Sequence, residues 1–293
     1  MNPKLEGVGH GGRFGRPSRT LLNVNSIEIV VDAAEAEEAG GLMWASGVAG
    51  IEERDESDGR VRLIAGVPEE ATSAVVEALD RWTVEVEPMD PDRWADSWRP
   101  YAKAARISGG IVVQPPWIEP IARPGELEVV LDPGRAWGHG AHPSTLLAAE
   151  DLVAAGDLAG RSVLDVGCGS GLLSVLAALR GADAVVAIDI EAAAVEATLA
   201  NALVNDVADS IDVSTTPVQV LDVRFDVVVA NIGLGVLVDL AAPLADRLGP
   251  DGRLILSGLL VEQVDAALGA YPDLREVSRR ELDGWGSLVL AAP

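Results

Sequence analysis

The segment from Val163 to Gly171 constrains the fold of this chain more than any other part of the sequence. It begins with the short, mainly apolar run Val163-Leu164-Asp165-Val166 and continues into glycines at 167, 169 and 171. Apolar residues then recur at helical spacing from Leu172 to Leu179. A strand, a glycine turn and a helix in this order predict a βα unit, whose glycines let the backbone approach a ligand at the edge of a parallel sheet.

The glycine spacing indicates which ligand such a unit binds. A dinucleotide fingerprint requires G-x-G-x-x-G, and Leu172 stands where its third glycine would fall; a P-loop is also absent, because no Gly-Lys-Ser/Thr follows. The pattern Asp-x-Gly-x-Gly-x-Gly instead resembles motif I of the seven-strand (class I) methyltransferases, which bind S-adenosylmethionine. Gly167, Gly169 and Gly171 are therefore expected to bind this methyl donor. The alternative is a glycine-rich turn that binds no ligand.

Two polar residues follow neighbouring predicted strands. Asp189 ends the apolar run 184–188, where its carboxylate is expected to accept hydrogen bonds from ribose hydroxyls. Asn231 ends the run 225–230, at the edge where an open sheet faces its ligand. Many amino-group methyltransferases carry an Asn-Pro-Pro-Tyr-like motif there, so Asn231 is the candidate catalytic residue that orients the amine. The alternative interpretation is a helix N-cap, a position that suits Asn.

Alternating strands and helices from Leu127 onward predict a doubly wound α/β sheet with right-handed crossovers, and the last two strands are expected to pair as an antiparallel hairpin at its edge. Strands are expected at 127–131, 162–166, 184–189, 211–214, 225–231, 252–257, 275–280 and 287–291. Helices are expected at 144–155, 171–180, 191–205, 234–248 and 261–268.

Four regions are predicted along the chain. Residues 1–20, rich in Gly and Arg and without the apolar core of a secretory signal, are expected to form a disordered tail. Residues 21–88 show a β-α-β-α-β rhythm typical of a small α+β domain, interpreted as a docking module. Residues 89–126 are expected to be a linker, with Trp94 and Trp98 on a helical turn, and residues 127–293 form the α/β domain.

Composition narrows the class of partner. The chain has 293 residues with 48% hydrophobic content, which is enough for sizeable cores, and its apolar runs are too short to span a membrane. A formal net charge of −24 argues against direct binding to nucleic acid and favours a basic protein partner, unless the acidity serves only solubility. A single cysteine and the lack of an export signal predict a cytoplasmic protein.

The loop that precedes motif I, residues 131–145, carries glycines at 134, 138 and 140 and is expected to cover the ligand. His139 and His142 lie in it, but the only other histidine is His10 in the tail, so no metal site is expected. Cys168, inside the glycine motif, is interpreted as a small residue beside the ligand, because methyl displacement needs no nucleophilic thiol.

These segments together resemble one family. The loop Leu131–Thr145, the D-V-G-C-G-S-G motif, Asp189, the run Ala230-Asn231-Ile232 and Leu256–Leu260 are similar to the ribosomal protein L11 methyltransferase family, PrmA. The resemblance implies a doubly wound seven-strand class I methyltransferase sheet with a smaller N-terminal α+β domain that docks the ribosomal protein.

The resemblance also implies roles for single residues. By it, Thr145, Gly167, Asp189 and Asn231 contact S-adenosylmethionine. The chain departs from the family pattern at Trp137, His139 and Ser144, where the family usually has Phe, Thr and Thr. These departures bear on the choice of target more than on the donor site.

The sequence thus predicts a protein N-methyltransferase that transfers methyl groups from S-adenosylmethionine to lysine side chains of a large-subunit ribosomal protein, with its N-terminal amine as a further target. No dedicated general base is assigned, and neither nucleic acid nor membrane is expected as a direct partner. One alternative is a methyltransferase for another protein or a small amine. Another is a non-catalytic binding protein that retains the methyltransferase fold.

Overall fold

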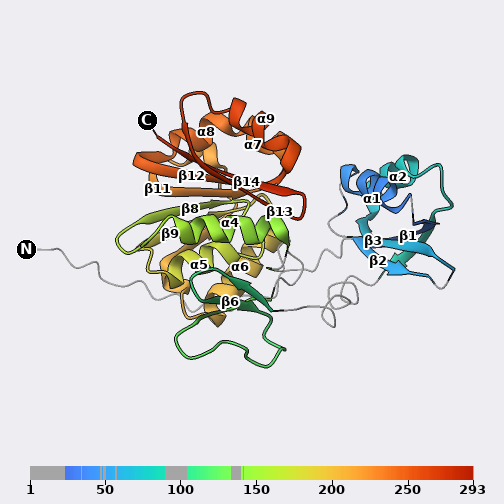
Figure 1. Cartoon of the computed structure of the whole chain (residues 1–293), viewed down its shortest axis with the longest axis horizontal. Helices are drawn as coiled ribbons and strands as arrows, with labels where there is room; N and C mark the ends of the chain where they lie inside the picture. Colours follow the sequence, from blue (N-terminus) through green and yellow to red (C-terminus); the bar gives the residue numbers. More distant parts are fainter. Residues whose placement is uncertain are drawn as a thin grey trace, which may run out of the picture. The chain divides into compact units, whose positions relative to one another are not determined.

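The computed structural model describes residues 24–33, 35–46, 48, 51–56, 58–89, 104–132, 140 and 142–292. Contacts divide the chain into two compact units, Met1–Trp94 and Ala95–Pro293 (Figure 1). Buried residues of the first unit form a hydrophobic cluster of their own, and those of the second form two further clusters. Each unit therefore has its own core and is described by itself.

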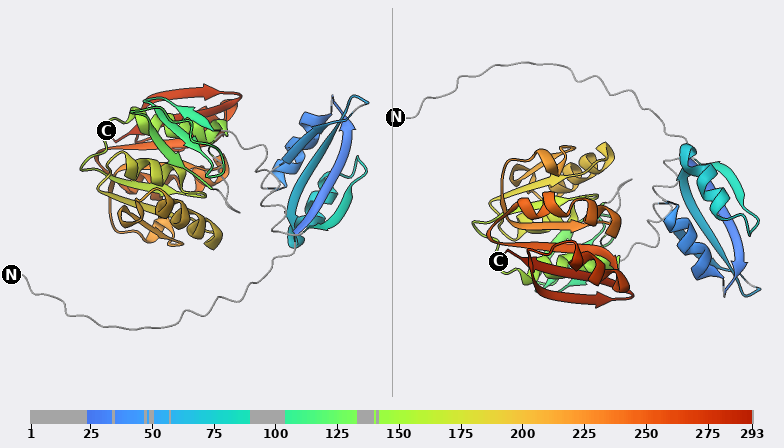
Figure 2. Two further views of the ribbon diagram at one scale, coloured as in Figure 1. Left: turned by 90° about the horizontal axis from the view of Figure 1, so that it is seen from below. Right: turned by 90° about the horizontal axis from the view of Figure 1, so that it is seen from above.

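The first unit is a four-stranded antiparallel sheet with two helices on one face (Figure 2). Its strand order is β2-β3-β1-β4. Ile27, Ile29 and Val31 alternate along β1 and pack with Met43 and Leu79 from the helical layer. This arrangement confirms the predicted smaller α+β domain. Its elements are β1 (Val24–Asp32), α1 (Ala36–Ala45), β2 (Ile51–Asp55), β3 (Arg60–Pro68), α2 (Glu69–Ala78) and β4 (Glu85–Met89).

The second unit is built on a seven-stranded sheet of order β10-β9-β8-β11-β12-β14-β13. The first five strands in this order, β10, β9, β8, β11 and β12, pair in parallel. Strand β14 is antiparallel to both of its neighbours, β12 and β13. Its strands are β8 (Ser162–Val166), β9 (Ala184–Ile188), β10 (Ile211–Ser214), β11 (Phe225–Asn231), β12 (Leu248–Leu260), β13 (Arg275–Leu282) and β14 (Trp285–Ala291). The predicted edge hairpin is confirmed: Asp283 and Gly284, both at positive φ, form its two-residue turn.

Helices cover both faces of this sheet, as expected for a doubly wound fold. Val163 packs with residues of α4, α5 and α6, while its neighbour Leu164 packs with residues of α7, α8 and α9 on the opposite face. Alternate residues of a strand point to opposite faces, so both must be apolar when both faces are covered. The helices are α4 (Pro143–Ala154), α5 (Leu172–Leu179), α6 (Ala192–Val204), α7 (Leu234–Asp239), α8 (Ala241–Asp246) and α9 (Val264–Gly269), with 3₁₀ turns η2 (Ala208–Ser210), η3 (Val218–Val220) and η4 (Val261–Gln263).

The prediction that residues 89–126 form a linker is wrong for residues 104–126. Strands β5 (Ala105–Ile107), β6 (Ile111–Gln114) and β7 (Leu127–Val130) form a separate three-stranded sheet, so the strand expected at 127–131 does not join the main sheet. Ile107, Ile111 and Val113 are buried in the same cluster as residues of α4 and α5. Because β5 has three residues and β6 is buried throughout, neither shows the alternation by which strands are recognised. Trp94 and Trp98 lie outside the described residues.

The prediction of a single helix at 234–248 is also wrong. The structure has α7 and α8, separated at Leu240, and residue 248 already begins β12. Pro243 lacks an N–H to donate to the carbonyl of Asp239, which interrupts a continuous helix but is tolerated in the first turn of a new one. In the part of the chain that the structure describes, no helix has both the length and the apolar content needed to cross a membrane.

Candidate functional site

The glycine motif forms the turn from β8 into α5. Gly167, Gly169 and Gly171 all have positive φ, between 54° and 81°. A Cβ atom on Gly167 would lie 2.5 Å from Cγ2 of Ile232, and one on Gly171 would lie 2.9 Å from the backbone Cα of Thr198. Both the conformation and the close packing therefore require glycine, which supports the interpretation of the loop as a backbone cradle.

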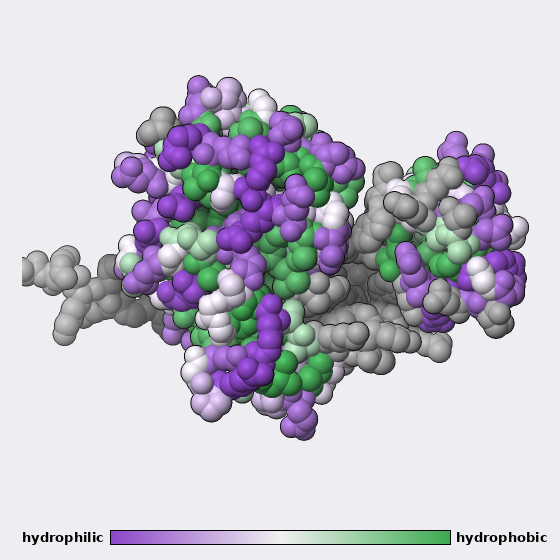
Figure 3. All heavy atoms as spheres, viewed as in Figure 1, coloured by the Kyte–Doolittle hydropathy of each residue, from purple (hydrophilic) through white to green (hydrophobic). Residues whose placement is uncertain are grey.

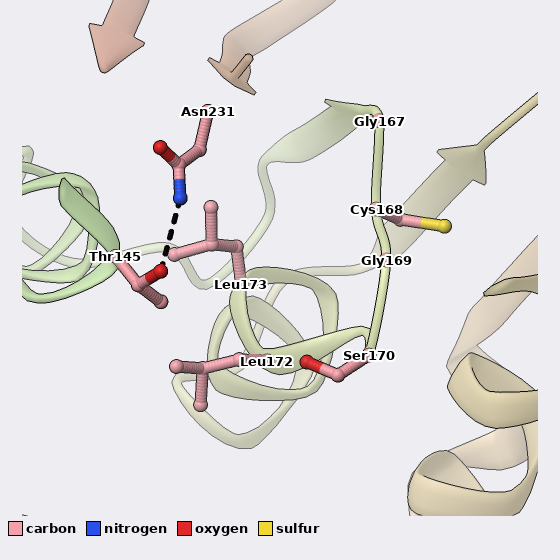
Figure 4. Close-up of a pocket in the computed structure, with 8 residues that line it drawn as sticks. All are labelled: Thr145, Gly167, Cys168, Gly169, Ser170, Leu172, Leu173 and Asn231. Carbon is pink, nitrogen blue, oxygen red and sulfur yellow. Dashed lines mark hydrogen bonds between the residues drawn. The ribbon is translucent and has the colours of Figure 1, made fainter. Parts of the chain in front are cut away.

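A pocket lies between this loop and the ends of β11 and α4 (Figure 4). Among the predicted site residues, Thr145, Gly167, Gly169 and Asn231 line it, whereas Gly171 and Asp189 do not. Gly171 is the N-cap of α5 and packs on Thr198 instead. The full lining consists of Thr145, Gly167, Cys168, Gly169, Ser170, Leu172, Leu173 and Asn231.

Asn231 and Thr145 point toward each other across one end of the pocket (Figure 4). Nδ2 of Asn231 donates a hydrogen bond of 3.1 Å to Oγ1 of Thr145. Oδ1 of Asn231 is buried and has no hydrogen-bond partner among the described residues. A buried acceptor without a partner costs free energy, which makes this oxygen a candidate to receive an N–H of a bound substrate.

The alternative role of Asn231 as a helix cap is wrong. The N-cap of the following helix, α7, is Gly233, two residues further along the chain. The amide of Asn231 is directed to Thr145 of α4 instead of to the first turn of α7.

Asp189 lies behind the loop and shapes it. Its Oδ2 accepts the N–H of Gly169 at 2.9 Å, and its Oδ1 accepts the N–H of Glu191 at 3.0 Å. Each carboxylate oxygen can accept a further hydrogen bond, so these contacts leave capacity for a ligand. The next residue, Ile190, is 95% exposed. Ile190 is not among the predicted site residues; its signal in the sequence is an isoleucine that directly follows the acid at a strand end.

Helix α6 supplies polar side chains that hold the loop from the other side. Oγ1 of Thr198 donates to the carbonyl of Gly169 at 3.1 Å, and Nδ2 of Asn201 donates to the carbonyl of Ser170 at 2.8 Å. Both side chains are buried. Neither is among the predicted site residues, although polar residues within a helix made mainly of Ala, Leu and Val are a recognisable signal of buried hydrogen bonding.

Cys168 has no reactive thiolate. Burial raises the pKa of its thiol to about 12, so the group stays protonated at neutral pH. Its side chain points away from Asn231 and Thr145 (Figure 4). Both observations support the interpretation of Cys168 as a small residue accommodated in the loop.

His142 caps helix α4. Its Nδ1 accepts the N–H of Ser144 at 3.3 Å, and its ring meets that of Trp285 edge-on, with centroids 4.6 Å apart. The same helix end is anchored to β12, because Oγ of Ser257 donates to the carbonyl of Ser144 at 2.8 Å. His142 thus helps to place Thr145, one turn into α4. Trp137 and His139 lie outside the described residues.

The motif acid Asp165 is a buried carboxyl group. Desolvation raises the pKa of Asp165 to about 6, although the hydroxyl of Ser174 donates to its Oδ2 at 2.6 Å and opposes this rise. Its Oδ1 has no hydrogen-bond partner among the residues that the structure describes. Ionised Asp165 therefore destabilises the folded protein at neutral pH.

The Asp165→Asn variant is expected to change how stability depends on pH. Because the folded pKa of Asp165 lies above the model value of 3.8, the wild-type protein loses stability as pH rises from about 4 to 6, and the loss persists above 6. The neutral amide removes this loss. Measured without ligand, the thermal midpoint of the wild-type protein should therefore fall relative to that of Asp165→Asn as pH rises through this range. A difference between the two proteins that stays constant with pH would contradict the assigned burial penalty.

A doubly wound sheet with an antiparallel edge hairpin, a glycine cradle after β8 and a polar strand end at Asn231 define a class I methyltransferase. The chain belongs to the ribosomal protein L11 methyltransferase (PrmA) family, whose model matches residues 63–292. This membership confirms the family resemblance inferred from the motifs.

Individual relatives agree with this membership. The chain is 38% identical over 262 residues to the ribosomal protein L11 methyltransferase of Sorangium cellulosum, covering 85% of this chain and 83% of the relative. It is 41% identical over 217 residues to that of Geotalea daltonii, covering 70% and 69%. The crystal structure of ribosomal protein L11 methylase from Lactobacillus delbrueckii subsp. bulgaricus superimposes with a TM-score of 0.59 at 29% identity, covering 64% of this chain and 98% of that chain.

Proposed function

We propose that this protein transfers methyl groups from S-adenosylmethionine to lysine side-chain amines of ribosomal protein L11. The observation that carries the proposal is the buried, unpartnered Oδ1 of Asn231 in a pocket that the glycine loop also lines. The names of the relatives supply the substrate, because they are described as ribosomal protein L11 methyltransferases.

The described residues fit the methyl donor. Gly167 and Gly169, both at positive φ, line the pocket without side chains. Asp189 retains acceptor capacity for ribose hydroxyls, and Ile190 offers apolar surface beside it for the adenine base. When bound, the donor supplies a sulfonium methyl group that is already activated for in-line displacement. The protein therefore has to align the amine and to stabilise its neutral form.

Asn231 is suited to that task. A lysine ammonium, with a reference pKa near 10.4, costs about 5 kcal/mol to deprotonate at pH 7. The partly enclosed pocket, lined by Leu172 and Leu173, disfavours the charged form. Oδ1 of Asn231 accepts an N–H of the neutral amine, while the bond from Nδ2 to Thr145 keeps the amide oriented. These residues align the amine without a dedicated general base.

The acceptor protein is expected to be basic. A net charge of −24 attracts a lysine-rich partner and repels nucleic acid. Hydrophilic side chains spread over the visible face of the second unit, with smaller hydrophobic areas among them (Figure 3). The first unit, with a core of its own, is proposed to dock the ribosomal protein.

Incubation with radiolabelled S-adenosylmethionine tests the proposal. The purified protein is mixed with ribosomal protein L11, with total ribosomal proteins, and with a small-molecule amine pool. Label in L11 lysines, located by mass spectrometry, is the expected result. Label in another protein or only in small amines would overturn the proposed acceptor. Failure to bind S-adenosylmethionine in calorimetry would instead favour a non-catalytic binding protein.

Asp189→Ala is expected to weaken S-adenosylmethionine binding by about 1 to 3 kcal/mol, the range for lost hydrogen bonds to a charged acceptor. The measurement is the dissociation constant from calorimetry, with circular dichroism to verify folding. Asp212→Ala, at an exposed position on the neighbouring strand β10, is the control and should leave donor affinity unchanged. Equal donor affinity in folded Asp189→Ala and wild-type protein would remove the ribose role.

A further inference from the structure

Helix α6 completes the outer edge of the three-stranded sheet with two asparagine side chains. Strand β7 is an edge strand of that sheet, so the N–H and C=O groups along its outer edge need partners. Val130 and Asp132 are two apart and present these groups in the same direction. Asn201 and Asn205 are four apart and therefore share one face of α6.

Each asparagine amide pairs with one residue of this edge as a peptide group would. Oδ1 of Asn205 accepts the N–H of Val130 at 2.9 Å, and its Nδ2 donates to the carbonyl of the same residue at 2.6 Å. Oδ1 of Asn201 accepts the N–H of Asp132 at 2.9 Å, and its Nδ2 donates to that carbonyl at 2.8 Å. In these bonds to the edge backbone, the two side chains are equivalent.

The second N–H of each amide distinguishes them. The second N–H of Asn205 is donated within its own helix, to the carbonyl of Asn201 at 2.8 Å. That of Asn201 reaches the glycine loop, where Nδ2 donates to the carbonyl of Ser170 at 2.8 Å. Asn201 is 2% exposed, so water does not replace these bonds.

We propose that Asn201 is a positioning residue for methyl transfer, because its one amide binds the donor-binding loop at Ser170 and the backbone of Asp132, two residues after the end of β7, and so fixes the position of one relative to the other. The proposal rests on the proposed function, in which the loop binds S-adenosylmethionine. Strand β7 precedes α4, the helix that carries Thr145, so these bonds also relate the donor loop to the amine-binding side of the pocket.

The matched pair Asn201→Asp and Asn205→Asp tests this role. Both changes are isosteric, both keep an oxygen for the N–H of β7, and both remove N–H donors. Only Asn201→Asp places a carboxylate against the carbonyl of Ser170. We expect the dissociation constant for S-adenosylhomocysteine, measured by calorimetry, to rise about 10-fold or more in Asn201→Asp and less than about twofold in Asn205→Asp, with a lowered thermal midpoint in both.

Equal changes in affinity for the two folded variants, or no change in either, would overturn the proposal and leave the proposed function intact. Absence of binding to the wild-type protein would overturn both. If Asn201→Asp does not fold, residue-resolved hydrogen exchange of the wild-type protein decides. The N–H of Asp132 is hydrogen-bonded to Asn201, and the N–H of Val130 is hydrogen-bonded to Asn205. S-adenosylhomocysteine should then slow hydrogen exchange at the Asp132 N–H more than at the Val130 N–H. Equal slowing of both amides would contradict the proposal.

Discussion

Asn231→Asp is expected to lower methyl-transfer turnover by about 10- to 1000-fold, equivalent to roughly 1.4 to 4 kcal/mol of barrier, in a protein that remains folded. The carboxylate loses the N–H that Asn231 donates to Oγ1 of Thr145, so the group is no longer held in one orientation. It also adds a negative charge that favours the ammonium form of the substrate, which cannot accept a methyl group. The measurement is single-turnover methylation of ribosomal protein L11 at saturating donor.

Donor affinity provides the control for this variant. Turnover is measured at saturating donor, so calorimetry with S-adenosylhomocysteine should show a fall in donor affinity that is smaller than the fall in turnover. Unimpaired turnover in a stable Asn231→Asp protein would show that the residue is structural. Among the residues that the structure describes, the candidates for positioning the amine would then be Thr145, which lines the same pocket, and His142, which caps the helix of Thr145.

Deletion of residues 1–88 is expected to abolish methylation of ribosomal protein L11 and to leave donor binding nearly intact. The first unit packs around its own hydrophobic cluster, whereas every pocket residue belongs to the second unit. Contacts of a protein substrate far from the reacting amine contribute to transition-state stabilisation, so their removal lowers kcat/KM by about 100-fold or more.

The deletion experiment uses two readouts. Calorimetry with S-adenosylhomocysteine reports the donor site, and label transfer to intact L11 reports docking. A truncated protein that binds the donor and methylates L11 at the original rate would show that the first unit does not dock the substrate. A truncated protein that no longer binds the donor would show that the second unit depends on the first for its fold.

The sequence by itself determined the parts of the molecule that local patterns encode. Apolar periodicity and glycine spacing located β8, the glycine loop and α5. The edge hairpin was predicted because no long helix separates the last two expected strands. These features depend on residues close together in the chain. For the same reason, Asp189 and Asn231 could be assigned to the edge where an open sheet faces its ligand, since Asp189 directly follows β9 and Asn231 is the last residue of β11.

Tertiary structure decided what depends on contacts between distant segments. The strands at 105–107 and 111–114 are too short or too uniformly apolar to show a period, and only packing against α4 and α5 makes them part of the core. The bond between Asn231 and Thr145, and the bonds from Asn201 to Asp132 and Ser170, join separate elements of the chain. Sequence patterns report the faces of single elements, whereas the partner of a buried polar group is set by which elements the fold brings together.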